Sequence, residues 1–164
     1  MSWWVMAFRW LHVISGIMWI GHLWYFNFVQ TPSMPKIPDE QKPAITKFIA
    51  PTALFWFRWG AMATIVTGLI LAYLNGYLAS AIRLGIGDYN AHNTAIGFGM
   101  WLGAIMWFNV WVLIWPNQKK VLGIVQAPPD EKKRAGRIAG LASRTNTMLS
   151  IPMLYAMVGA GHFY

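Results

Sequence analysis

The sequence predicts an all-α integral membrane protein in which residues 1–164 form one transmembrane four-helix bundle. Of the 164 residues, 57% are hydrophobic and only 11% are charged, and the mean hydropathy is +0.41. Soluble domains usually carry about 25% charged residues, and a soluble fold this short could not bury so much apolar surface. The 11 Trp and 6 Tyr residues, many of them near the ends of apolar runs, are typical of membrane–water interfaces.

Four apolar runs are long enough to cross a bilayer, which takes about 20 residues each. They cover residues 3–29, 51–74, 93–115 and 140–161. We expect the second run to begin near Pro51, because proline suits the first turn of a helix, and the third to stop at Pro116. The segment 128–131, Pro-Pro-Asp-Glu, predicts a helix start whose basic continuation lies along the membrane interface ahead of the fourth span.

The distribution of basic residues predicts the orientation in the membrane. The two loops at residues 30–50 and 117–144 share one side of the membrane and hold ten of the 13 Lys and Arg residues. Basic loops favour the cytoplasmic face. We therefore expect a multi-pass protein of a bacterial inner membrane with both termini in the periplasm. We therefore interpret the net charge of +8 as a signal of membrane orientation. The sequence contains no nucleic-acid-binding motif, so we expect no nucleic-acid partner.

Histidine is the residue type that points to a cofactor. The chain has four histidines and no cysteine, which excludes thiolate and iron–sulfur chemistry. The expected topology gathers His12, His92 and His162 toward the outer face, whereas His22 lies about 15 Å further along the first helix. A b-type haem needs two imidazoles at similar depth on different helices, and helical bundles build such sites. We expect His12 as one axial ligand and His162, with His92 as the alternative, as the other.

Two neighbours of His12 fit a haem site. Gly16, one turn away on the same face, would let a flat macrocycle approach, and Arg9, one turn in the other direction, could meet a propionate. Alternatively, the outer histidines only cap helix ends and the glycines serve helix packing. The Gly99–Gly103 pair would in addition offer a groove for a neighbouring membrane protein.

A second polar set is expected in the cytoplasmic half of the bundle. It comprises His22, Arg58, Asn109, Asn146 and Ser150. A charge at the membrane centre costs at least about 2.5–3.5 kcal/mol, so we expect Arg58 to donate hydrogen bonds to Asn109, to fourth-span polar groups or to backbone carbonyls. The set is either a structural hydrogen-bonded cluster or a quinone or proton site. No acidic residue lies within the four runs, which argues against a carboxylate proton relay.

Several segments together resemble one family. They are residues 9–21 (RWLHVISGIMWIG), 56–59 (WFRW), 109–120 (NVWVLIWPNQKK) and 144–152 (RTNTMLSIP), with His162 close behind. This set resembles the membrane domain of the urate-oxidase-like family, which is linked to urate hydroxylation. Family members often carry a cytochrome c domain after the membrane part. This sequence has no CxxCH motif, so we expect a separate c-type cytochrome as partner. The start Leu-His-Val-Ile also resembles, more loosely, the membrane protoporphyrinogen oxidases, which use a helical bundle and haem.

These observations predict a haem-b-binding subunit that carries electrons near the periplasmic face within a larger respiratory or redox complex. Its expected partners are membrane lipid, other membrane subunits and a c-type cytochrome. Two alternatives stay open: a membrane oxidase of the urate or porphyrinogen type, and a structural subunit without a cofactor.

Overall fold

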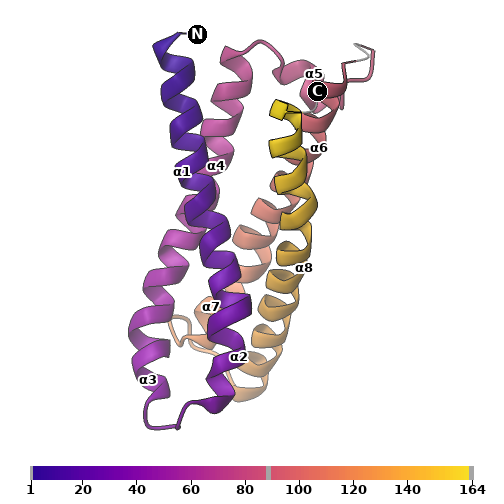
Figure 1. Cartoon of the computed structure of the whole chain (residues 1–164). Coiled ribbons are helices and arrows are strands. Elements are labelled where there is room, and N and C mark those ends of the chain that lie inside the picture. Colours follow the sequence, from indigo (N-terminus) through magenta and orange to yellow (C-terminus); the bar gives the residue numbers. More distant parts are fainter. Residues whose placement is uncertain (1, 88–89, 163–164) are drawn as a thin grey trace.

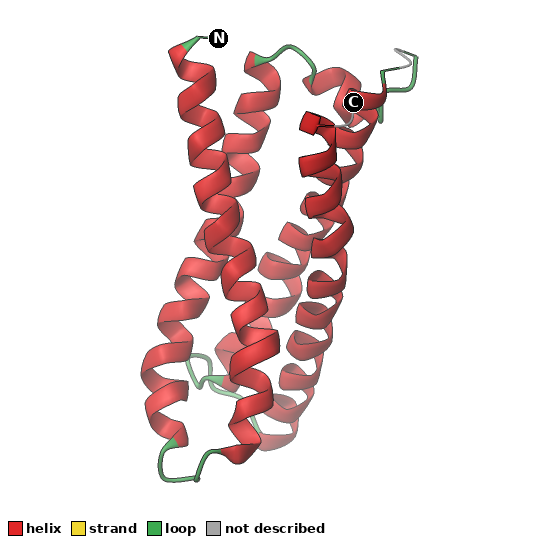
Figure 2. Cartoon of the chain, in the orientation of Figure 1, coloured by secondary structure: helices red, strands yellow, loops and turns green. Residues whose placement is uncertain are grey.

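The structure, a computed structural model, describes residues 2–87 and 90–162. Over these residues the chain is helical with short connections and contains no β-strand (Figure 2). Its long helices run side by side in one elongated bundle (Figure 1). The all-α class predicted from the sequence is confirmed.

Each of the first three long helices is built from several pieces that follow one another without a break. The first contains α1 (Trp3–Trp24), the π-helical segment η1 (Tyr25–Gln30), α2 (Thr31–Ser33) and the 3-10 turn η2 (Met34–Lys36). The second contains α3 (Lys42–Ala44), the π-helical segment η3 (Ile45–Ile49) and α4 (Ala50–Leu74). The third contains α6 (Ala91–Phe108), the π-helical segment η4 (Asn109–Ile114) and α7 (Trp115–Val121). The short α5 (Leu78–Ile82) precedes α6, and the 34-residue α8 (Pro129–His162) ends the described chain.

Three of these helices are long and apolar enough to cross a membrane. They are Trp3–Lys36, Lys42–Leu74 and Ala91–Val121. Each contains one of the first three predicted runs and extends beyond it, so the expected loops at 30–50 and 117–144 are mostly helical. The fourth predicted run, 140–161, lies inside α8, which is equally long but more polar.

Proline residues lie within all four long helices and do not end them, and in the first three a π-helical segment precedes the proline. Pro32, Pro51 and Pro116 each stand two residues after a π-helical segment. Proline lacks an N–H and crowds the carbonyl four residues earlier, and a wider turn ahead of it makes room for that carbonyl. The prediction that Pro116 stops the third helix is therefore wrong, because the helix continues to Val121. Pro51 likewise lies inside a helix that starts at Lys42.

The basic segment ahead of the fourth run belongs to α8. This helix begins at Pro129 with Asp130 and Glu131 in its first turn, as the Pro-Pro-Asp-Glu segment predicts. It then continues without a break to His162. A separate interfacial segment was therefore a wrong expectation, since the basic residues share one axis with the rest of the helix.

The two ends of the bundle differ in charge. One end holds the first turn of α1, the last turn of α8, and α5 (Figure 1), and we term it the α5 end. The opposite end holds α2, α3, α7 and the start of α8, and we term it the basic end. Its segments carry ten of the 13 basic residues: Lys36, Lys42, Lys47, Lys119, Lys120, Lys132, Lys133, Arg134, Arg137 and Arg144.

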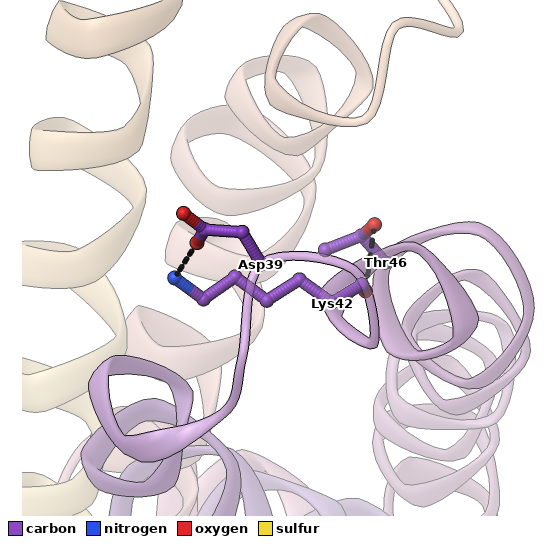
Figure 3. Close-up of polar contacts among 3 residues, drawn as sticks. All are labelled: Asp39, Lys42 and Thr46. Atoms are coloured by element: carbon purple, nitrogen blue, oxygen red, sulfur yellow. Dashed lines mark hydrogen bonds and ion pairs between the residues drawn. The ribbon is translucent and has the colours of Figure 1, made fainter.

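Ion pairs close the two connections at the basic end. Lys42 Nζ donates to Asp39 Oδ1 at 2.6 Å, and the Thr46 hydroxyl donates to the Lys42 carbonyl at 3.2 Å (Figure 3). The hydrogen bond from Lys42, together with its charge, lowers the pKa of the Asp39 carboxyl. A second ion pair, Lys120 with Glu131, joins α7 to α8. The Lys42–Asp39 pair thus fixes the start of α3 on its own loop, whereas the Lys120–Glu131 pair holds two helices together.

The contiguous apolar core fills the half of the bundle nearer the basic end. Its buried members are Trp19, Ile20, Leu23, Leu54, Phe57, Ala61, Met106, Val110, Ile114, Ala142 and Met153. Toward the α5 end the buried residues are mostly small, such as Ala72, Gly97, Gly99, Gly159 and Ala160. In that half α1 packs mainly on α4, and α6 packs mainly on α8.

Candidate functional site

His12 is held in the seam between α1 and α4. Its Nδ1 lies 2.9 Å from the carbonyl oxygen of Thr64. A carbonyl only accepts, so Nδ1 carries the proton and Nε2 keeps its lone pair. The half-buried ring lies against Gly68, where a Cβ atom would come within 2.7 Å of Cε1. The backbone of α4 therefore fixes both the tautomer and the position of this imidazole.

The two residues expected to assist His12 lie on either side of it. Gly16 faces the same seam, since a Cβ there would lie 4.0 Å from the Thr64 methyl group. Arg9 is exposed nearer the α5 end, close enough to Tyr77 for its charge to act on the phenol. A side chain at position 16 would therefore meet only an ordinary van der Waals contact, and Arg9 leaves its guanidinium at the surface.

His92 links α6 to α8 near the α5 end. Its Nδ1 lies 2.6 Å from the carbonyl oxygen of Ala160, which again leaves Nε2 as the nitrogen with the lone pair. The ring packs edge-to-face on Tyr77, with 5.7 Å between centroids. Burial raises the pKa of the Tyr77 phenol, and the charge of Arg9 opposes that shift. Next to His92, Asn93 donates to the buried hydroxyl of Ser80 at 3.0 Å and so fixes α5 on α6.

The other two histidines bond to their own helices. His162 is exposed, and its Nδ1 lies 2.9 Å from the carbonyl of Val158. His22 lies in the basic half, with Nδ1 2.7 Å from the carbonyl of Met18. It lines an open, mostly apolar groove of about 550 Å³ on the surface of α1 and α4. Within residues 2–87 and 90–162, no hydrogen bond joins any two histidines, and no three His, Asp or Glu side chains converge as metal ligands.

Asn109 and Asn146 form the centre of the predicted polar set. The Asn109 amide donates to Asn146 Oδ1 at 2.8 Å, and the Asn146 amide donates to the Met106 carbonyl at 2.9 Å. Asn146 is 0% exposed, so these two bonds compensate for its desolvation. The pair joins α8 to the third long helix.

Sequence reasoning missed two further polar contacts between the first long helix and α8. Trp24 Nε1 donates to the Ser150 hydroxyl at 3.0 Å, and the Asn27 amide donates to the Ser143 hydroxyl at 2.7 Å. Ser143, Asn146 and Ser150 therefore form one polar stripe on the inner face of α8, in addition to the charged residues of its first half. The sequence signal that could have predicted the second contact is the side-chain amide of Asn27 within an apolar run, because such an amide needs a hydrogen-bond partner.

Arg58 lies outside this polar set. Its Cζ atom is 3.8 Å from the centroid of the Trp115 ring and 5.4 Å from that of Phe55. Within the described residues its side chain makes no hydrogen bond, so the expected bonds to Asn109, to fourth-span polar groups or to backbone carbonyls are not formed. The Asn109 amide is engaged by Asn146, and the aromatic face of Trp115 attracts the guanidinium instead. His22 is likewise absent from the set, because its ring bonds to its own helix.

The Gly99–Gly103 pair is buried inside the chain. A Cβ at Gly99 would lie 2.9 Å from the Met157 methyl group of α8, and one at Gly103 would lie 3.9 Å from Ile65 of α4. The missing side chain of Gly99 thus allows close packing on α8, whereas a Cβ at Gly103 would meet Ile65 at an ordinary contact distance. The expectation that this groove contacts a neighbouring membrane protein is wrong, since the bundle's own helices occupy it.

Comparison with known families covers the second half of the chain. Residues 85–164 match the family model described as Urate oxidase N-terminal. These 80 residues, just under half of the 164, are similar to the urate-oxidase-like family. They contain His92, the Asn109–Asn146 pair and His162, whereas His12 and Arg58 precede them. The resemblance seen in segments 109–120 and 144–152 is confirmed, whereas segments 9–21 and 56–59 lie ahead of the matched residues. No curated protein and no solved structure matches the chain.

Proposed function

We propose that the chain is a four-span membrane subunit that binds one b-type haem in the half nearer the α5 end and carries electrons there. The observation that carries the proposal is the setting of His12. Its Nδ1 is bound to a backbone carbonyl, its ring is packed on a glycine, and its Nε2 retains a lone pair. An imidazole oriented by a carbonyl in this way is the usual form of a metal-ligating histidine.

The fourth span of this proposal is the outer part of α8. The 34 residues of this helix exceed the roughly 20 needed to cross the hydrocarbon. Its polar stripe faces α1 and the third long helix, where Asn146 and Ser150 are fully buried. Exposed positions such as Met148, Ile151 and Val158 present apolar side chains instead. A helix with hidden polar groups and an apolar outer face suits a bilayer.

The proposed orientation puts the basic end in the cytoplasm. Ten of the 13 Lys and Arg residues lie in the segments at that end, and the positive-inside rule assigns them to the cytoplasmic side. Both termini then face the periplasm of a bacterial inner membrane. The haem proposed near the α5 end would lie close to the periplasmic surface.

The second axial ligand is proposed to be His92 or His162. His92 is half-buried and anchored across helices by the Ala160 carbonyl, whereas His162 is exposed and bonded only to its own helix. These contacts favour His92. His12 and His92 belong to different helix pairs, α1 with α4 and α6 with α8, and the contiguous core lies nearer the basic end. This arrangement supports a group placed between the two pairs in the other half.

The proposed haem supplies reversible one-electron transfer, so a donor and an acceptor are part of the proposal. A c-type cytochrome at the periplasmic face and other membrane subunits are the proposed partners. The second candidate function is oxidation of a urate-type substrate, and the family match over residues 85–164 favours it. Porphyrinogen oxidation and a purely structural role are the two remaining alternatives.

The test is a visible spectrum of the purified protein and of two histidine variants. We expect a reduced b-type α-band that His12→Ala abolishes or shifts. His22→Ala is the matched control, because His22 lies on the same helix and bonds only to its own backbone. A spectrum without haem, or an unchanged band in His12→Ala, would overturn the proposal. His92→Ala and His162→Ala then identify the second ligand.

A further inference from the structure

We propose that Arg58, Trp115 and Lys119 form a binding site for the phosphodiester of an anionic phospholipid at the basic end of the membrane-spanning region. The site is separate from the histidines and does not depend on the proposed haem. It is built by two long helices, with Arg58 in α4 and the other two residues in α7.

The site gathers two cations on one indole. The Arg58 Cζ atom is 3.8 Å from the centroid of the Trp115 ring, and Lys119 Nζ is 5.8 Å from the same centroid. The ring attracts both charges through its electron-rich faces. The Arg58 guanidinium makes no side-chain hydrogen bond with the described residues, so its N–H groups are available to a phosphate.

Nearby carboxylates do not neutralise these cations. Among the described residues, the ion-paired acids are Asp39, held by Lys42, and Glu131, held by Lys120. Neither Arg58 nor Lys119 has an ion pair or a side-chain hydrogen bond with the described residues. Arg58 and Lys119 therefore have no anionic partner among the described residues, and an anion from outside the chain would supply one.

The depth of the site matches a lipid headgroup. Aromatic side chains surround it at the level expected of a membrane interface: Phe55, Trp56, Trp59 and Trp111. Trp56 and Trp59 are 49% and 47% exposed, so they face the surroundings of the bundle. The opposite ends of the helices carry Trp3, Trp4 and Tyr73, also exposed. Trp4 precedes Trp24 by 20 residues in α1, about 30 Å, which is the thickness of the hydrocarbon.

A phospholipid explains why an arginine is tolerated at this position. Arg58 lies only two residues beyond Trp56 and can direct its guanidinium toward the headgroup layer along Trp115. There a lipid phosphate satisfies its donors, while the acyl chains cover the neighbouring apolar surface. Basic pockets between helices on the cytoplasmic side bind anionic headgroups in this manner. The phosphodiester and a net negative charge are the features that the site recognises.

The experiment measures lipid retention and lipid-dependent stability of the full chain. Protein in mild detergent is mixed with phosphatidylglycerol, with phosphatidylcholine or with inorganic phosphate, and is analysed by native mass spectrometry and thermal unfolding. We expect phosphatidylglycerol to be retained and to raise the melting temperature, whereas the other two additions have little effect. Arg58→Gln and Lys119→Gln should each weaken retention by about fivefold, since one basic residue at a surface contributes about 1 kcal/mol.

Two control variants distinguish a defined site from general charge attraction. Lys132→Gln removes a charge at the same end, and Arg83→Gln removes one at the α5 end, where its Nε bonds to the Ala79 carbonyl of its own segment. Both should retain phosphatidylglycerol as the parent protein does. Equal losses in all four variants, equal retention of phosphatidylcholine, or the same stabilisation by inorganic phosphate would overturn the proposal. If Arg58→Gln does not fold, Lys119→Gln decides the result alone.

Discussion

The imidazole of His12 and the backbone of Gly68 are in direct contact across the α1–α4 seam. A Cβ atom at position 68 would lie 2.7 Å from Cε1 and 2.9 Å from Nδ1 of the ring. Two helices thus approach closely where one of them carries glycine and the other carries histidine. The same approach brings Nδ1 within 2.9 Å of the Thr64 carbonyl.

Gly68→Ala should therefore displace the His12 ring. The added methyl group overlaps the imidazole, and such overpacking typically costs about 1–3 kcal/mol. We expect lower stability in detergent and, if His12 ligates haem, a several-fold lower haem content. Gly21→Ala is the matched control, because a Cβ there would meet no atom within 4 Å and alanine favours a helix. Identical stability and haem content in the two variants would contradict the assigned role of Gly68.

Asn146→Leu should destabilise the packing of α8. The variant removes two hydrogen bonds at a fully buried position and leaves the Asn109 side-chain amide without a partner, while the Met106 carbonyl keeps the backbone N–H of Asn109 as its donor. The expected loss is about 1–3 kcal/mol, measured by denaturant or thermal unfolding in detergent. Met148→Leu on the same helix is the control, since Met148 is 75% exposed. A loss no larger than that of the control would show that the asparagine pair contributes nothing net.

The fold class could be predicted from the sequence because it follows from composition. A chain with 11% charged residues must place its apolar surface in lipid, and helices satisfy the backbone there. Helix ends were harder to predict. Pro116 and Pro51 are breakers by local chemistry, but the π-helical turns ahead of them accommodate the rings, and that accommodation depends on packing with neighbouring helices.

The candidate site could be predicted only in part, because its partners are often backbone atoms. His12 and His92 bond to the carbonyls of Thr64 and Ala160, and every residue has a carbonyl. Asn109 and Asn146 were expected in one polar set, but the hydrogen bond between them was not predicted, because Arg58 was the expected donor to Asn109. The contact between Arg58 and the Trp115 ring was not predicted. An arginine in a sequence suggests a hydrogen-bond acceptor as its partner, and the sequence does not indicate which aromatic ring will contact it instead.

Tyr77 should ionise above the ordinary range of a phenol. Burial raises its pKa, so the folded protein keeps the proton where an unfolded chain releases it at about pH 10. The stabilising contribution is fully present below that pH and is lost as the pH rises through the folded-state pKa. Ultraviolet titration of tyrosinate should therefore lose its highest-pH component in Tyr77→Phe. In the control Tyr73→Phe, the high-pH component should persist, because the Tyr73 ring is 73% exposed. If Tyr73→Phe also lost this component, its assignment to Tyr77 would be wrong.

Single cysteines should report opposite sides of the membrane for the two ends of the bundle. The chain contains no cysteine, so each introduced thiol is the only target for labelling. Ala79 lies in α5, and Val125 lies between α7 and α8 at the basic end; both are exposed. In intact bacterial cells a membrane-impermeant maleimide should label Ala79→Cys and leave Val125→Cys unlabelled until the membrane is permeabilised. The physical reason is the charge asymmetry, since ten of the 13 basic residues lie in segments at the Val125 end. Labelling of Val125→Cys in intact cells would reverse the orientation. It would also move the proposed haem to the cytoplasmic side, where a periplasmic cytochrome could not reach it.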